Sequence, residues 1–230
     1  MDYSIRNRKV AITRWKKIHS SIKLKKKLSR EKTAINAYLC GDGDISIRKK
    51  FRYDIRFYLD DLELSKRLVN LFKKEFNIKP KIRKMSSKVL GGKGYYKVEI
   101  SNKPVCKHLM KMGTYGSLTW NIPKNLSLKN QKEWIKCFFD CEAHVNIAKK
   151  QIQLKSVNYD GLTILKKLLE NQKILPKLYG PYVQKGENHN PYGFLIILGK
   201  ENLLKYYKKI GFYHSHKIKS LNNLIKTLNL

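Results

Sequence analysis

Apolar and polar positions repeat along this chain with an offset of about one hundred residues. One apolar segment ends at Asp42, and a second ends at Glu142. Two runs of alternating apolar and polar residues follow each segment, which is the pattern of half-buried strands. Leucine and phenylalanine then recur at helical spacing over 64–72, and leucine does so over 162–169. A further pair of strand-like runs and a short helix end each copy. The pattern therefore predicts helix, strand, strand, helix, strand, strand, helix, twice.

Two copies of this length indicate pseudo-two-fold symmetry, whereas solenoids have repeats of about 20 to 50 residues. We expect each copy to form one four-stranded antiparallel sheet with helices on one face, which is an α+β arrangement. A boundary is predicted in NIPKNLS, at 121–127, because this stretch contains Pro, Asn and a Ser suited to capping the next helix. The first two strands are expected at 46–50 and 54–59 in copy one, and at 146–150 and 151–155 in copy two. The expected division is a basic N-terminal extension over 1–28, a first repeat over 29–121 and a second repeat over 122–230.

The chain carries a large excess of positive charge. Its 230 residues include 50 Lys and Arg against 17 Asp and Glu, which gives a formal net charge of +33. Such an excess repels itself unless a polyanion neutralises it, and nucleic acid is the obvious partner. A membrane surface is the rival partner. However, the sequence has no long apolar run, and its charge is not confined to one amphipathic helix.

The first residues and the cysteines bear on location. The opening, MDYSIRNRKV, has no apolar segment of the kind that signal peptides contain, so secretion is not expected. We expect a cytoplasmic, nucleoid-associated protein or an organellar one. The four cysteines lack CxxC pairing, which favours reduced, packed thiols over a disulfide framework or a zinc site.

The candidate chemistry lies where the two apolar segments end. Residues 35–43 read INAYLCGDG and residues 135–143 read IKCFFDCEA, so that each segment places an acidic residue directly before a small one. Small residues also recur on one helix face of each segment, which lets two helices approach closely. If the two helices pack together, the carboxylates of Asp42 and Glu142 lie side by side. Two carboxylates together at a positively charged surface are what a divalent metal ion needs.

This pattern resembles the LAGLIDADG homing endonucleases, in their single-chain form with two motif copies. The resemblance covers residues 29–225 and includes the motif spacing and the order of strands and helices between the motifs. It implies a saddle of two antiparallel sheets with the motif helices packed at the centre. The chain departs from the family pattern at Cys40, where an acidic residue is common, and at Ala143 and His144, where Gly and Ser are usual.

The resemblance also implies roles for particular residues. Asp42 and Glu142 would be the metal-binding catalytic acids, with the backbone carbonyls of Gly41 and Cys141 helping to hold the ions. Two or three divalent ions, normally Mg²⁺, would bridge the carboxylates and the two scissile phosphates.

Further residues are expected around this centre. Lys217, with Lys219 as second choice, would polarise the attacking water or neutralise developing charge. Copy one has Gly116 or Ser117 at the matching place, which suggests unequal cleavage of the two DNA strands. Two polar residues at the ends of the second strands would order waters in the site. These are Asp61 and Asn158.

Strand alternation predicts which side chains face away from the helices. Arg, Lys and Gln at such positions are the side chains that read guanine and adenine edges in the major groove of DNA. The other lysines are expected to contact phosphates, which makes affinity depend steeply on salt. The predicted DNA-contacting residues are Arg48, Lys50, Arg56, Tyr58, Lys81, Arg83, Lys150, Gln151, Gln153, Lys155 and Lys177.

The expected function is therefore that of a monomeric, Mg²⁺-dependent endonuclease that cuts a long, asymmetric site in double-stranded DNA and leaves short 3′ overhangs. The chain starts with Met and ends in LNL, which favours an intron-encoded or free-standing mobile-element protein over an intein. Two alternatives stay open: a maturase that binds intron RNA, and a DNA-binding regulator that has lost catalysis. A structural basic protein would explain the charge, but not the paired acids in matched repeats.

Overall fold

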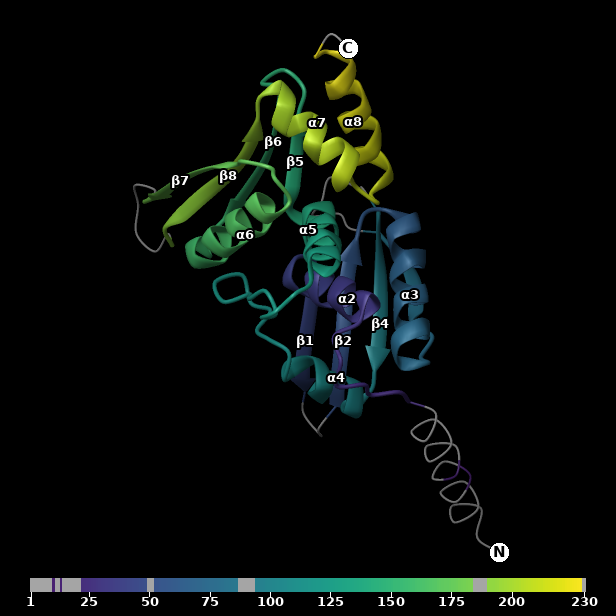
Figure 1. The fold of residues 1–230 in the computed structure, drawn as a ribbon. Coiled ribbons are helices and arrows are strands. Elements are labelled where there is room, and N and C mark those ends of the chain that lie inside the picture. Colours follow the sequence, from purple (N-terminus) through teal and green to yellow (C-terminus); the bar gives the residue numbers. More distant parts are fainter. Residues whose placement is uncertain are drawn as a thin grey trace, which may run out of the picture.

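The computed structural model describes residues 22–48, 52–86, 94–183 and 190–228, together with Val10 and Thr13. Its elements follow the predicted order in two consecutive repeats (Figure 1). The first repeat comprises α2 (Arg30–Cys40), β1 (Gly43–Arg48), β2 (Arg52–Leu59), α3 (Leu62–Phe76), β3 (Lys81–Met85), β4 (Tyr95–Ser101) and α4 (Lys103–Met110). The second comprises α5 (Leu128–Glu142), β5 (Ala143–Asn146), β6 (Gln151–Ser156), α6 (Tyr159–Asn171), β7 (Lys177–Tyr182), β8 (Tyr192–Leu198) and α7 (Lys200–Lys209). A further helix, α8 (Ser215–Lys226), follows the second repeat and was not predicted.

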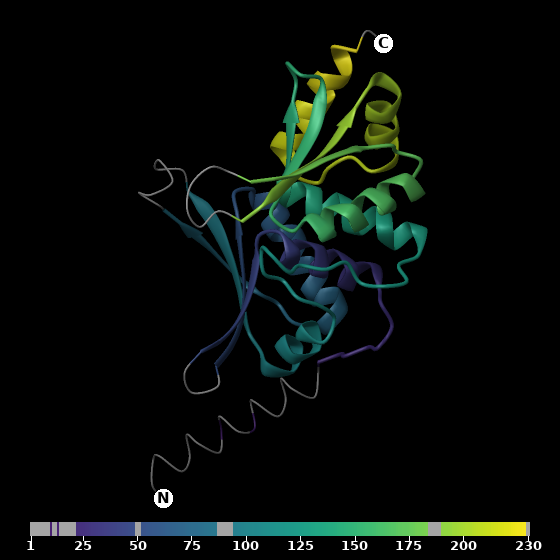
Figure 2. The ribbon, with the colours of Figure 1, turned by 90° about the vertical axis from the view of Figure 1, so that its left-hand side faces the viewer.

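The two sheets have the same topology. Their strand orders are β1-β2-β4-β3 and β5-β6-β8-β7, and all neighbouring strands are antiparallel. The helices cover one side of each sheet, and the other sides line a common concave side of the molecule (Figure 2). The predicted α+β fold of two four-stranded antiparallel sheets with helices on one face is confirmed.

The strands that follow the motif helices begin earlier than expected. β1 starts at Gly43 and β5 at Ala143, directly after the two acidic residues. In the second repeat, the expected strand over 146–150 is wrong, because residues 147–150 form a turn. The Asn146 side chain accepts a hydrogen bond from the Lys149 amide at 2.9 Å, and the Lys150 amide donates to Ile147, which closes this turn. Of the expected N-terminal extension, residues 22–28 contain neither helix nor strand, and nearly all the rest lies outside the described residues.

The starts of the helices are fixed by polar caps. Ser127 caps α5 as predicted, accepting from the amide of Asn130, and Ser29 caps α2 in the same way through Lys32. Capping satisfies amides that a helix start leaves without partners. Each motif helix therefore begins at a defined residue, which also fixes where it delivers its acidic end.

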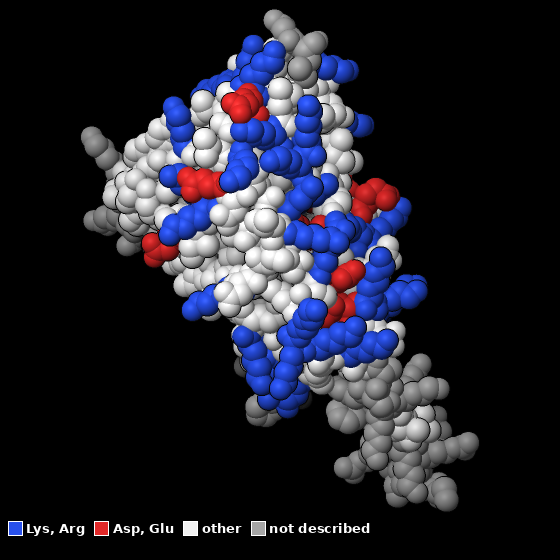
Figure 3. Space-filling view, viewed as in Figure 1, with Lys and Arg blue, Asp and Glu red and all other residues white. Residues whose placement is uncertain are grey.

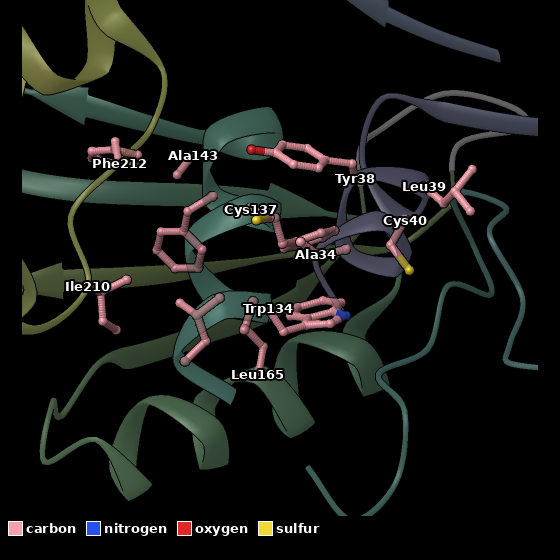
Figure 4. Close-up of a cluster of buried hydrophobic side chains, with 14 of the residues drawn as sticks. Ala34, Tyr38, Leu39, Cys40, Trp134, Cys137, Ala143, Leu165, Ile210 and Phe212 are labelled. Carbon is pink, nitrogen blue, oxygen red and sulfur yellow. The ribbon is translucent and has the colours of Figure 1, made fainter. Parts of the chain in front are cut away.

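The centre of the molecule is the contact between α2 and α5. Figure 4 shows Cys137 of α5 directed toward Ala34 and Tyr38 of α2, with Trp134 further along the same helix. These side chains are fully buried. Trp134 also stacks on Phe138 at 4.7 Å between ring centroids. Within the described ranges, no helix combines the length and apolar character needed to span a bilayer.

A buried carboxylate joins the two repeats beneath this contact. Glu133 of α5 is 3% exposed and accepts from Arg30 at 2.6 Å and from Arg67 at 2.5 Å, both in the first repeat. The Tyr213 hydroxyl donates to the same carboxylate. Because buried charges are stable only when paired, this network holds the repeats in one relative position.

Candidate active site

The two motif helices are closest where they end. A Cβ placed on Gly41 would lie 2.4 Å from the Cβ of Cys141 and 3.5 Å from Oε1 of Glu142. Glycine at this position is therefore required by the close approach of the helices. Asp42 follows Gly41 and Glu142 follows Cys141, so the two predicted acids lie beside each other between the two sheets.

Their surroundings disfavour the charged forms of both acids. Burial raises the pKa of Asp42, while a hydrogen bond from Cys141 and the charge of Lys217 oppose that rise. Desolvation by the surrounding protein, and then the negative charge of Asp42, raise the pKa of Glu142 to about 7, although this residue stays open to solvent. A carboxylate pair in this condition would be stabilised by a divalent cation.

One cavity, of about 430 Å³, adjoins Asp42 and contains the predicted basic residue. Lys217 lies in its wall with Asp60 and His214, whereas the second choice, Lys219, is not among the lining residues. The Lys217 ammonium donates to the carbonyls of Phe139 at 3.2 Å, Asp140 at 2.5 Å and Cys141 at 3.0 Å. It thus neutralises the C-terminal end of α5 while facing the cavity.

A second cavity, of about 600 Å³, adjoins Glu142 on the side of the first repeat. Its wall includes Gly41, Gly116, Ser117 and Lys155. The position that matches Lys217 by the repeat is therefore occupied by small or neutral residues, as the sequence indicated. The two cavities present different chemistry to the two acids.

The two residues expected to order water have a structural task instead. Asp61 caps α3 by accepting from the amides of Glu63 and Leu64, and its other oxygen accepts from Ser215 at 2.8 Å. Asn158 caps α6 through Gly161. All the carboxylate oxygens of Asp61 are thus engaged away from the Asp42 cavity.

Asn158 has a second bond that holds it in place. Its amide donates to the carbonyl of Trp120 at 2.6 Å, and Asn158 is only 8% exposed. Neither Asp61 nor Asn158 lines the two cavities described above. Helix capping, which the sequence reading did not consider for them, accounts for both residues.

The structure instead brings Asp60 and His214 to the Asp42 cavity. His214 Nε2 lies 2.9 Å from Asp60 Oδ1, and this contact lowers the pKa of Asp60. Sequence reasoning missed this pair because 154 positions separate the two residues. The only sequence signal was the doublet Asp60-Asp61 at the end of a predicted strand.

The buried Asp140 positions the segment that carries Lys217. Its carboxylate accepts from the amides of Tyr213 and His214 and from the Tyr38 hydroxyl. Burial nevertheless raises the pKa of Asp140 to about 6. Lys217 is thereby placed by hydrogen bonds that start two residues before Glu142.

Most predicted DNA-contacting side chains lie on the concave sides of the sheets. The strand registers place Arg56 and Tyr58 on the side opposite the helices, together with Gln151, Gln153 and Lys155. The exposed residues Lys81, Arg83 and Lys177 occupy the outer strands, and Lys150 lies in the β5–β6 turn. Arg48 ends β1, and Lys50 lies outside the described residues.

The donor set of the site is small. Among the described residues, no group of three or more His, Cys, Asp or Glu side chains converges as a metal cluster. The carbonyl of Cys141, which the family resemblance assigns to a metal, accepts a hydrogen bond from Lys217. The protein therefore offers the two carboxylates as its principal ligands, and the phosphates of a substrate would have to supply others.

Comparison with known proteins gives the same two-fold division. A family model described as a LAGLIDADG-like domain matches the chain twice, over 31–112 and 129–211. A probable translation initiation factor IF-2 of Methanocaldococcus jannaschii is 34% identical over 94 residues, which is 41% of this chain and 8% of that protein. The chain thus spans less than a tenth of that relative's length.

Solved structures share the fold. A structure of mesophilic variants of the homing endonuclease I-DmoI has a TM-score of 0.55 and 18% identity, covering 79% of this chain and 97% of that one. I-DmoI in complex with DNA and Ca has a TM-score of 0.57 and 16% identity, covering 83% and 97%. Full-length DUF199/WhiA from Thermatoga maritima has a TM-score of 0.54 and 16% identity, covering 88% and 62%.

Proposed function

The chain belongs to the LAGLIDADG family, in the single-chain form with two copies of the domain, and on this premise we propose that it is a site-specific endonuclease for double-stranded DNA. The observation that carries the proposal is the placement of Asp42 and Glu142. They end two packed helices and lie between two sheets whose outer sides bear Arg, Lys and Gln. A regulator that only binds DNA would need the sheets but not the paired acids.

The residues present fit a divalent metal ion. Carboxylate oxygens are the protein ligands that Mg²⁺ prefers, and a cation would relieve the repulsion between Asp42 and Glu142. These two residues would hold two or three ions together with phosphate oxygens of the DNA. When bound, Mg²⁺ supplies charge to the scissile phosphate and makes water a nucleophile at neutral pH. I-DmoI complexes with DNA and Mn, Ca or Mg support the use of divalent ions.

Other side chains of the Asp42 cavity would act on the same phosphate. Lys217 would place a positive charge beside the oxygens on which negative charge develops. Asp60, held by His214, would accept a hydrogen bond from water in the cavity and orient it. The Glu142 cavity lacks a counterpart of this set in its wall, which supports unequal rates for the two DNA strands.

The two sheets would bind a long asymmetric site as a monomer, because one chain already supplies both halves. The site would span about two helical turns of DNA, with one half on each sheet. Short 3′ overhangs would follow from cleavage across the minor groove, as the family resemblance implies. The biological role would be the mobility of an intron or a similar element.

A second candidate function, RNA binding, is favoured by the helical side of the molecule. Figure 3 shows Lys and Arg side chains gathered over this side, opposite the sheets. A cavity of about 680 Å³ between α5, α7 and α8 is lined by Arg30, Lys129, Lys132, Lys136, Lys208 and Lys209. Phosphates of an intron RNA could bind there while the sheets are free for DNA.

Cleavage of a randomised duplex library with Mg²⁺, followed by sequencing of the product ends, tests the proposal. We expect cuts at one long sequence with 3′ overhangs, and none when EDTA replaces Mg²⁺. Tight duplex binding without cutting under Mg²⁺ or Mn²⁺ would contradict the nuclease and leave the regulator. Specific binding of a structured RNA without duplex cutting would favour the maturase.

A further inference from the structure

The concave sides of the two sheets differ in chemistry at matched positions. The strand registers define the match, because Gly43 pairs with Phe57 as Ala143 pairs with Leu154. On this basis Arg56 in the first sheet corresponds to Gln153 in the second, and both point away from the helices. Further matched pairs, in the same order of sheets, are Lys97 with Phe194, Glu99 with Ile196, and Arg83 with Tyr179.

The first sheet presents a network of charged side chains. Arg56 lies 2.7 Å from Asp44, Arg52 lies 3.1 Å from Asp54, and Lys97 lies 2.9 Å from Glu99. Ion pairs of this kind restrict the rotamers of the basic side chains before DNA arrives. A guanidinium held in place has a smaller entropic cost when it donates two hydrogen bonds to the O6 and N7 atoms of guanine.

The second sheet presents amide and apolar side chains instead. Tyr192, Phe194, Ile196 and Leu198 follow one another on the outward side of β8, and each is partly exposed. The Tyr182 ring lies 5.9 Å from that of Tyr192 and is 44% exposed. The described outward positions of this sheet include no acidic residue and therefore no ion-pair network.

Each kind of surface suits a different base composition. Gln donates and accepts two hydrogen bonds with adenine, and apolar side chains contact the methyl group of thymine, whereas Arg is matched to guanine. In the second sheet Gln151 and Gln153 lie beside the apolar row, and their amides are joined by a hydrogen bond of 2.9 Å. A cavity of about 530 Å³ with both glutamines, Tyr182 and Phe194 in its wall provides the contact surface.

We propose that the second sheet recognises an A·T-rich half-site through Gln151, Gln153 and the apolar row of β8, while the first sheet recognises a half-site that contains G·C pairs. This inference rests on the proposed DNA-binding function and names the composition of its substrate. Mere shape recognition by a uniformly basic saddle would give both halves the same composition.

Selection of bound duplexes from a randomised library, in EDTA so that the DNA stays intact, tests the inference. We expect one half of the selected site to be A·T-rich and the other to contain fixed G·C pairs. Two matched exchanges assign the halves. Gln153→Arg should change one adenine to guanine within the A·T-rich half, with a preference on the order of tenfold to a hundredfold. Arg56→Gln should change a guanine in the other half.

The outcomes separate this inference from the proposed function. Failure to select any duplex would contradict the DNA-binding function itself. A selected site whose Gln153-dependent half is no richer in A·T than the other half would overturn the inference alone. It would equally be overturned if the wild-type protein sediments as a dimer that Phe194→Lys dissociates, because the apolar row would then serve contact between two copies of this chain.

Discussion

Gly41 of α2 lies directly against Cys141 of α5, so closely that a Cβ on Gly41 would be 2.4 Å from that of Cys141. This contact sets the separation of the two acidic residues that follow Gly41 and Cys141 in the chain. Since Cβ atoms do not approach so closely, a side chain at position 41 must push the helices apart. The geometry of the carboxylate pair thus depends on the absence of one side chain.

Replacing Gly41 by Ala should destabilise the protein and separate the acids. We expect a loss of about 1–3 kcal/mol in the free energy of unfolding, because the new methyl group meets a packed helix. Gly116→Ala is the matched control, since its Cβ would meet only the hydroxyl of Thr119, at 3.1 Å. Urea denaturation measures both variants. Equal stability of the two would show that the helices are not in close contact.

The buried Glu133 should be needed for the joint between the repeats. Glu133→Gln leaves Arg30 and Arg67 with an uncharged partner, so we expect the free energy of unfolding to fall by about 3 kcal/mol. Glu170→Gln breaks only the half-exposed pair of Glu170 with Lys166, and should change stability by less than about 0.5 kcal/mol. Thermal unfolding of both variants is the measurement. A loss for Glu133→Gln as small as that of the control would rule out this joint.

The raised pKa of Glu142 predicts a stability that depends on pH. In the metal-free protein this pKa is about 7, against an ordinary 4.5, so the unfolded chain releases this proton more readily than the folded chain. The carboxylate therefore costs no stability below pH 4.5, an increasing amount up to about pH 7, and a constant amount above it.

Glu142→Gln removes this cost. Because the carboxylate is open to solvent, we expect a gain in the free energy of unfolding of only about 1 kcal/mol at pH 8, and almost none at pH 4. Chemical denaturation at both pH values, without metal or DNA, measures the difference. A gain of the same size at pH 4, or a loss at pH 8, would contradict the raised pKa.

Lys217 should act unequally on the two DNA strands. Lys217→Met keeps the length of the side chain but removes the charge beside Asp42, so one strand should be cut about a hundredfold more slowly and nicked DNA should accumulate. Strand-specific labels on the duplex report the two rates. Lys219→Met, at an exposed position outside the cavity wall, should cut both strands at the normal rate. Equal slowing of both strands in Lys217→Met would contradict the asymmetry of the cavities.

The fold was predictable because the chain states it twice. Periods of two and of three to four residues recur in both repeats, and the two acids end matched apolar segments, so element order and the site centre followed from local patterns. The doublet Asp60-Asp61 could not be resolved in this way. Helix capping uses Asp61, whose carboxylate reaches the amides of Glu63 and Leu64, and leaves Asp60 for the cavity.

Contacts between distant segments were beyond the sequence. The partner of Asp60 is His214, and the three carbonyls that receive Lys217 belong to α5, which lies more than seventy residues earlier. No local period encodes such pairings, because they depend on how α8 packs against the end of α5. The choice of Lys217 over Lys219 likewise required the structure.

The most direct test of the account is the rate of Mg²⁺-dependent cleavage of the selected duplex by Asp42→Asn and Glu142→Gln, with DNA affinity measured in Ca²⁺. Asp44→Asn is the matched control, since Asp44 lies two residues away and pairs with Arg56. We predict at least a hundredfold loss of cleavage in both acid variants, with affinity retained, and a near-normal rate in the control. Cleavage that survives either acid substitution would contradict a shared metal site formed by Asp42 and Glu142.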